Sequence, residues 1–147
     1  MSGVVCAIRG GASSQTTINQ AILQAQNTNS HLYFLYVVNL DFLSHTQSSR
    51  TRLISKEMHQ MGEFILLTAQ VTAEAQGVTA EGVVRHGEVT EEIINLAKEI
   101  EADTIILGQP EGVDEDDVFT LERLKAFSAR LSEESGAQVI IAEGDEE

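Results

Sequence analysis

The chain has 147 residues, of which 42% are hydrophobic and 22% are charged. These values are typical of a globular domain and exclude a disordered or fibrous chain. Its one cysteine, Cys6, excludes an internal disulfide and a cysteine zinc cluster. No apolar run approaches the ~20 residues that span a bilayer, and the signal-peptide pattern is missing. We therefore expect a cytoplasmic protein, with one domain over residues 1–143 and an acidic tail over residues 144–147.

Charge divides the sequence into two parts. Lys and Arg number 9, Asp and Glu number 23, and the net charge of −14 arises entirely from residues 88–147. Because binding to phosphates depends on Lys and Arg side chains, we expect no nucleic acid and no membrane as partner. A solvated acidic surface that keeps the protein in solution is the simpler interpretation.

The first third of the chain predicts a strand, a helix and a second strand. Residues 4–8 and 32–38 are continuous apolar runs, which suit parallel strands covered on both faces. Ser13 or Ser14 can cap the first turn of the helix between them. Its apolar face has the i, i+3, i+4, i+7 spacing and consists of Ile18, Ala21, Ile22 and Ala25.

The middle of the chain predicts a second helix, an edge strand and a third helix. Gly77 stands where a left-handed residue would end the second helix. Residues 79–85 give a weaker strand pattern that contains Gly82, as expected at the edge of a sheet. The negative charges of Glu91 and Glu92 stabilise the positive N-terminal end of the third helix. The expected buried stripes are Met61, Phe64, Ile65, Thr68 and Ala69 in the second helix, and Ile93, Ala97 and Ile100 in the third.

The last third predicts two more strands, at residues 104–107 and 139–142, on either side of a fourth helix that ends at Gly136. The stripe of that helix is Leu121, Leu124, Ser128 and Leu131. Regular alternation of strands and helices predicts an α/β fold with a mostly parallel sheet and right-handed crossovers.

Ligands of such sheets bind beyond the carboxyl ends of the strands, at the switch point of the strand order. Three segments should meet there, namely residues 9–14, 39–50 and 108–117. The middle segment has about twelve residues and no clear pattern. Loops of that length are often functional, and a loop without function is an equal alternative.

Four segments together resemble the universal stress protein family, over nearly the whole chain. Residues 4–8 followed by Gly10 are similar to the family's first strand and turn. Residues 83–87 and the helical pattern after them are similar to its third strand, the following glycine and the next helix. Ala-Asp-Thr-Ile-Ile-Leu-Gly at 102–108 resembles its Ala-Asp-Leu-Ile-Val-Met-Gly signature. Gly-Ala-Gln-Val-Ile-Ile-Ala at 136–142 takes the place of its Cys-Pro-Val-Leu-Val-Val strand.

The resemblance implies an adenine-nucleotide-alpha-hydrolase-like fold, with a five-stranded sheet of order 3-2-1-4-5 and helices on both faces. It also implies a homodimer through the last strand, Val139, Ile140, Ile141 and Ala142. An apolar edge strand exposes unpaired backbone groups. Pairing with a second copy across a two-fold axis would cover them.

Family members that bind ATP carry an Asp after the first strand, a Gly-x-x-Gly loop after the fourth, and later a Gly followed by Ser or Thr. Glycines let backbone N–H groups close around phosphates. Here Arg9 replaces the Asp, and Gly108 matches the first glycine while Glu111 holds the second position. Gly112 comes one residue late, and Pro110 removes a backbone donor. No Gly-Ser or Gly-Thr pair follows at the family's spacing.

Acidic side chains crowd the segment that would hold a triphosphate, at Glu111 and at residues 114–117. One like-charge pair at ~4 Å costs about 4 kcal/mol at an effective dielectric constant near 20. We therefore expect no cofactor and no ATP binding of the family's usual kind. ATP or AMP with Mg²⁺, held by a rearranged loop that uses Gly112, is the alternative. Residues 114–117 lack the ligand pattern of a calcium loop, and no metal site is expected.

The turn formed by Arg9, Gly10 and Gly11 has two interpretations. It can form an anion-binding nest at a helix N-terminus, and it faintly resembles the Ser-Gly-Gly-x-Asp-Ser loop of ATP pyrophosphatases. Alternatively, it is a tight turn whose Arg9 pairs with the acidic loop after the fourth strand and closes the nucleotide site. Of the four histidines, only His86 follows a strand near the expected cleft. None has the His-x-x-x-His spacing of a metal site.

These observations lead to three hypotheses of function. The first is a non-enzymatic, dimeric regulatory or adaptor domain with a protein partner that the sequence does not name. The second is an AMP- or ATP-binding sensor that uses the Gly108–Gly112 loop. The third is an enzyme related to the ATP pyrophosphatases, which is disfavoured because no nucleophile, base or metal set can be assembled.

Overall fold

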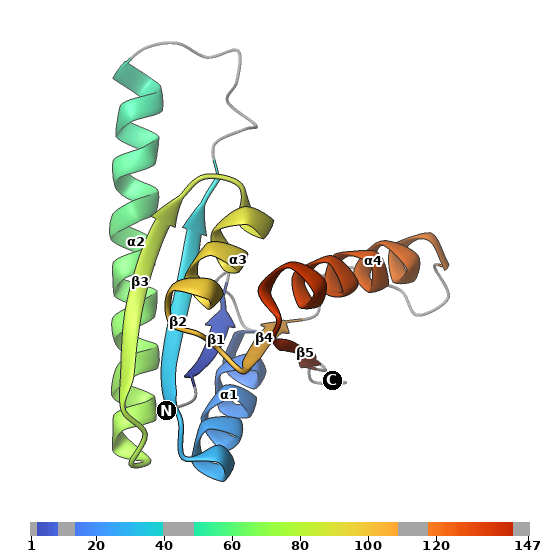
Figure 1. The fold of residues 1–147 in the computed structure, drawn as a ribbon. Helices are drawn as coiled ribbons and strands as arrows, with labels where there is room; N and C mark the ends of the chain where they lie inside the picture. Colours follow the sequence, from blue (N-terminus) through green and yellow to red (C-terminus); the bar gives the residue numbers. More distant parts are fainter. Residues whose placement is uncertain (1–2, 9–13, 40–48, 109–117, 143–147) are drawn as a thin grey trace.

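The computed structural model describes residues 3–8, 14–39, 49–108 and 118–142, and over these ranges strands and helices alternate (Figure 1). In chain order the elements are β1 (Gly3–Ala7), α1 (Ser14–Thr28), β2 (His31–Val38), α2 (Ser49–Ala75), β3 (Ala80–His86), α3 (Val89–Glu99), β4 (Thr104–Gly108), α4 (Val118–Ser135) and β5 (Gln138–Ala142). The predicted cap Ser13 and the tail at residues 144–147 lie outside the described residues. No helix within them is long and apolar enough to cross a membrane.

The sheet has five strands in the order β3-β2-β1-β4-β5, and every neighbouring pair is parallel. This confirms the predicted fold class and strand order. β1 lies at the centre, with Cys6 opposite Phe34 of β2 and Ile106 of β4. β3 and β5 are the two edges, which confirms the edge position predicted for residues 79–85.

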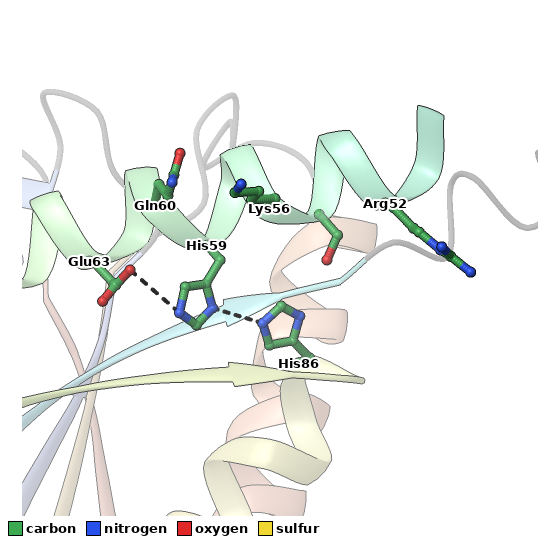
Figure 2. Close-up of a pocket in the computed structure, with 7 residues that line it drawn as sticks. Arg52, Lys56, His59, Gln60, Glu63 and His86 are labelled. Carbon is green, nitrogen blue, oxygen red and sulfur yellow. Dashed lines mark hydrogen bonds and ion pairs between the residues drawn. The ribbon is translucent and has the colours of Figure 1, made fainter. Parts of the chain in front are cut away.

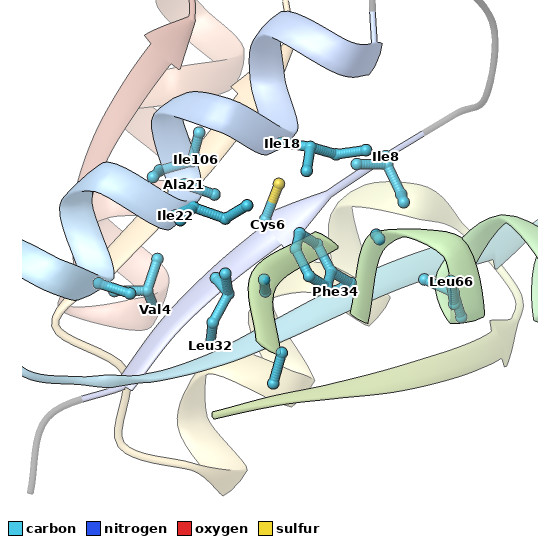
Figure 3. Packing of buried hydrophobic residues seen from close by; sticks show 14 of the residues in the cluster. Val4, Cys6, Ile8, Ile18, Ala21, Ile22, Leu32, Phe34, Leu66 and Ile106 are labelled. Carbon is cyan, nitrogen blue, oxygen red and sulfur yellow. The ribbon is translucent and has the colours of Figure 1, made fainter. Parts of the chain in front are cut away.

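Each face of the sheet is covered by two helices. Alternate strand residues such as Cys6 and Phe34 pack on one face against α1 and α2 (Figure 3). The residues between them, such as Val5 and Leu35, pack on the other face against α3 and α4. Because both faces are buried, the strands read as continuous apolar runs in the sequence.

The stripes predicted for α1 and α3 agree with the structure, and so does the part of the α4 stripe whose side chains are described. All four residues of the predicted α1 stripe are buried, as are Ile93 and Ala97 of α3 and Leu131 of α4. Gly77 and Gly136 follow α2 and α4 with φ of 82° and 79°, in the left-handed region that ends a helix. The side chains of Leu121 and Leu124 are not among those that the structure describes.

The prediction for α2 is partly wrong. Met61, Phe64 and Thr68 were assigned to the buried stripe, but Met61 and Phe64 are 55% and 71% exposed, and Thr68 is exposed as well. The helix also begins at Ser49, inside the segment predicted as a loop. Large apolar residues occur on two opposite sides of α2, so their spacing alone does not identify the inner side. The residues that are buried are mostly small, namely Gly62, Leu66, Ala69 and Ala73.

An ion-pair group joins the edge strand β3 to α3. The guanidinium of Arg85 contacts both carboxylate oxygens of Glu99, at 2.9 and 3.1 Å, and lies 3.9 Å from Glu92. The hydrogen bonds from Arg85 hold the pKa of the Glu99 carboxyl below its ordinary value. The same bonds raise the pKa of Arg85.

Candidate functional site

The carboxyl ends of β1 and β2 form a pocket beside the switch point of the sheet, which lies between β1 and β4. We call it the switch-point pocket. Its volume is about 230 Å³. Ala7 and Ile8 come from the end of β1, Met58 from α2, and Val89 from the first residue of α3. Leu35, Tyr36, Val37 and Asn39 of the β2 end complete the lining. The walls are mostly apolar, which suits a flat ring system more than a phosphate chain.

Backbone geometry at the end of β3 places Val89 in this pocket. The N–H of Gly87 donates to the carbonyl of Val38 at 3.0 Å, and Gly87 has φ of 148°. A Cβ at position 87 would lie 2.9 Å from a carboxylate oxygen of Glu92. Glycine therefore permits the sharp turn that brings the start of α3 beside the end of β2.

Gly108 ends β4 at the same edge of the sheet, where it packs against α1. A Cβ at position 108 would lie 2.7 Å from the hydroxyl of Thr17, a buried residue in the first turns of α1. The glycine predicted as the start of a phosphate loop thus has a packing role in the described structure. Substitution of Gly108 would disturb the fold as well as any ligand.

Most of the residues predicted for the switch point lie outside the described residues. They are Arg9, Gly10, Gly11 and Gly112, together with the acidic residues Glu111 and 114–117. Neither the anion nest nor the pairing of Arg9 with the acidic loop is described, and both stay predictions.

His86, the remaining predicted ligand-binding residue, lies at the end of β3 in a second pocket of about 600 Å³ (Figure 2). Its neighbours there come from α2 and are Arg52, Ser55, Lys56, His59, Gln60 and Glu63. Met58, next to His59 in the chain, lines the switch-point pocket instead. The two pockets thus lie on different sides of the N-terminal half of α2.

The two histidines in the second pocket contact each other directly. Nδ1 of His59 and Nε2 of His86 are 2.9 Å apart, and the rings are stacked with their centroids 5.1 Å apart. Nε2 of His59 lies 3.5 Å from a carboxylate oxygen of Glu63, one helical turn further on (Figure 2). The His59 ring is therefore held between a carboxylate and a second imidazole.

Sequence reasoning did not identify His59, Met58 or Val89 as site residues. The spacing of His59 and Glu63, four residues apart, was a usable signal once residues 49–75 were assigned to a helix. The pairing of His59 with His86 depends on how α2 packs against β3, and no local pattern encodes it.

Cys6 has no part in either pocket. It is fully buried in the centre of β1, and burial raises the pKa of its thiol far above the ordinary value. Cys6 therefore packs as a small buried hydrophobic residue.

The chain has an α/β fold with a pocket beyond the carboxyl ends of two parallel strands, at the edge where ligands of such sheets bind. A sequence model described as "Universal stress protein family" matches residues 1–114. The chain therefore belongs to the universal stress protein family, as the resemblance indicated. No curated protein sequence matches the chain.

Solved structures of this family have the same fold. A family member from Burkholderia pseudomallei is 20% identical, with coverage of 95% of this chain and 94% of that one and a TM-score of 0.72. A universal stress protein solved in complex with cAMP is 22% identical, covers 98% of both chains and has a TM-score of 0.71. One from Archaeoglobus fulgidus in complex with dAMP is 14% identical, with coverage of 97% and 98% and a TM-score of 0.63.

Proposed function

We propose that this protein is a non-enzymatic regulatory domain that binds an adenine nucleoside monophosphate in the switch-point pocket. The observation that carries the proposal is the mostly apolar pocket of about 230 Å³ between Met58 and Val89. It is smaller than the ~300–1,000 Å³ of pockets that hold drug-sized ligands. Such a pocket suits the ring of a nucleotide, with the ribose and phosphate outside it.

Two structural neighbours support the choice of a monophosphate, because their structures contain cAMP and dAMP. The sequence of this chain adds a reason against ATP. Glu111 and residues 114–117 place five carboxylates in the segment that follows β4. Each further phosphate charge near them raises the electrostatic cost of binding.

A non-enzymatic role is supported by the chemistry of the pocket walls. Among the described residues that line the pocket, none carries a carboxylate, an imidazole or a thiol. A general base or a covalent nucleophile would need one of these groups or a hydroxyl activated by one of them, so the phenol of Tyr36 alone supplies neither. Binding alone, with the bound state read by another molecule, requires none of them.

A pair of matched substitutions tests the site. Val89→Phe adds a ring inside the pocket, whereas Val71→Phe adds the same ring on the outer side of α2, where Val71 is 58% exposed. We expect 1 mM AMP to raise the melting temperature of the natural protein and of Val71→Phe, and to leave that of Val89→Phe unchanged. An equal shift in all three proteins would place AMP elsewhere and refute the proposed site.

We also propose that two copies associate through β5. The strand is a sheet edge, and Val139, Ile140 and Ile141 are only half-buried within one copy. An unpaired apolar edge of this kind favours association with another strand. A symmetric pair would bury the same three side chains in both copies.

A further inference from the structure

The pair formed by His59 and His86 lies outside the proposed nucleotide pocket. His59 comes from α2 and His86 from the end of β3, and their facing nitrogens are 2.9 Å apart. Both rings are accessible, because His86 is exposed and the side chain of His59 is 39% exposed. The pocket around them has a volume of about 600 Å³, so ions and water can reach the nitrogens.

We propose that His59 and His86 bind a divalent transition-metal ion through Nδ1 and Nε2, respectively, and that water occupies the remaining coordination positions. Imidazole nitrogen is a preferred ligand of Zn²⁺, Co²⁺, Ni²⁺ and Cu²⁺. The inference rests on the two rings and their surroundings and does not depend on the proposed nucleotide function.

The distance between the two nitrogens is close to what a metal ion requires. With Zn–N bonds of about 2.0–2.1 Å and tetrahedral angles, two histidine nitrogens on one ion lie about 3.3 Å apart. The present separation of 2.9 Å therefore needs to widen by only about 0.4 Å. His86 is at the end of an edge strand, and small rotations of its exposed ring can supply that widening.

Glu63 gives the His59 ring the orientation that a metal ligand needs. A carboxylate near Nε2 of His59 favours the tautomer with its proton on Nε2, which leaves a lone pair on Nδ1 facing His86. Metal-binding histidines commonly donate their other N–H to a carboxylate, and a small approach of Glu63 from its present 3.5 Å would complete that arrangement here. When the ion binds, the proton on Nε2 of His86 moves through water to Nδ1 of the same ring, so neutral histidines release no net proton.

The same surroundings limit the affinity to the level of a two-ligand site. Within the ranges that the structure describes, no group of three or more His, Cys, Asp or Glu side chains could hold a metal ion. Arg52 and Lys56 line the pocket and repel a cation, although Figure 2 shows both side chains directed away from the two rings. We expect dissociation constants in the micromolar range, and tighter binding when Lys56 is neutralised.

Cobalt(II) is the direct probe, because its visible absorption reports the ligands it acquires. Protein without an affinity tag would be titrated with CoCl₂ at pH 7.5 and then with ZnCl₂ as competitor. His59→Ala and His86→Ala are each expected to weaken binding at least tenfold. Glu63→Ala should weaken it about tenfold as well, as for other outer carboxylates. Lys56→Gln should strengthen it.

His31→Ala is the matched control. His31 begins β2, with its ring tilted by 31° from that of Tyr33, whereas the pair lies at the carboxyl ends of the strands. All variants would be checked for folding by their unfolding midpoints in urea. The proposal is supported if the His59 and His86 variants lose tenfold or more and Glu63→Ala loses about tenfold, while His31→Ala binds like the natural protein. It is overturned if the natural protein binds no Co²⁺ below 1 mM, or if His31→Ala is as weak as the other two.

Discussion

Gly62 of α2 lies directly against the ring of Tyr36 from β2. A Cβ at position 62 would come within 2.5 Å of Cδ2 and 3.0 Å of Cε2 of that ring. The absence of a side chain thus sets how closely the long helix approaches the sheet. Because Tyr36 and Met58 both line the switch-point pocket, this contact also fixes one wall of the proposed site.

Gly62→Ala should destabilise the protein in spite of the better helix propensity of alanine. Alanine gains about 0.5–1 kcal/mol in a helix, but overpacking a close contact costs about 1–3 kcal/mol. We expect a net loss of about 1–2 kcal/mol in the free energy of unfolding, measured by urea denaturation. Gln60→Ala, on the exposed side of α2, is the control. An unchanged or higher stability for Gly62→Ala would contradict the close approach.

Adjacent leucines of α2 should respond very differently to truncation. Leu66 is 2% exposed in the core, and Leu67 is 58% exposed. We expect Leu66→Ala to cost about 2–5 kcal/mol and Leu67→Ala to change the free energy of unfolding by about 0.5 kcal/mol or less. Comparable losses in urea denaturation would mean that the outer side of α2 is covered.

The Cys6 thiol should be unreactive in the folded protein. Its burial raises the pKa and so removes the thiolate that reacts with disulfide reagents. At pH 8 we expect no reaction with 5,5′-dithiobis(2-nitrobenzoic acid) until urea unfolds the chain, and then one thiol per chain. Fast labelling of the native protein would show that β1 is accessible.

The contact between Arg85 and Glu99 should make stability depend on pH on the acidic side. Because Arg85 lowers the pKa of Glu99 in the folded state, its stabilising effect is complete above the unfolded pKa of about 4.3. The effect disappears as the pH falls through the folded pKa. We expect Glu99→Gln to lower the melting temperature slightly at pH 6, and by progressively less as the pH falls below about 4.3. Added salt should reduce the difference at pH 6, because the pair is exposed.

The change in melting temperature between pH 6 and pH 2.5 must be compared with that of a second variant that loses the same charge. Glu101→Gln, at an exposed residue just beyond α3, controls for the loss of one negative charge. If both variants change equally between pH 6 and pH 2.5, the contact with Arg85 contributes nothing specific.

Proline substitutions in β5 should separate folding from association. The N–H of Gln138 donates to the carbonyl of Asp103 at 2.9 Å, on the β4 side. Since successive N–H groups of a strand point to opposite sides, that of Ile140 also faces β4 and that of Ile141 faces the open edge. We expect Ile141→Pro to fold as a monomer and Ile140→Pro to destabilise the fold. Sedimentation velocity that shows a monomer for the natural protein would refute association through β5.

The sequence predicted the sheet well because its strands are buried on both faces. A continuous apolar run such as residues 32–38 therefore predicts a strand without any knowledge of the strands and helices that pack against it. The same reasoning failed for α2. This helix packs against the sheet through small residues such as Gly62 and Ala73, whereas Phe64 faces outward. Periodicity is judged from large apolar residues, and a helix that packs through small ones is misread.

The candidate site was predicted only in outline. Topology alone placed the ends of β1 and β2 at a ligand-binding edge, and a pocket lies there. Its individual walls could not be predicted, because Met58 and Val89 reach it through the packing of α2 and the turn at Gly87. Gly108 matches the first glycine of the family's phosphate loop, and its lack of a side chain also accommodates Thr17. Its role in phosphate binding stays a prediction.

Calorimetric titration of the purified protein with AMP and with ATP, each with Mg²⁺, tests the central proposal most directly. We predict saturable AMP binding in the micromolar range and ATP binding at least tenfold weaker. No heat with AMP up to millimolar concentration, or ATP bound as tightly as AMP, would contradict the account.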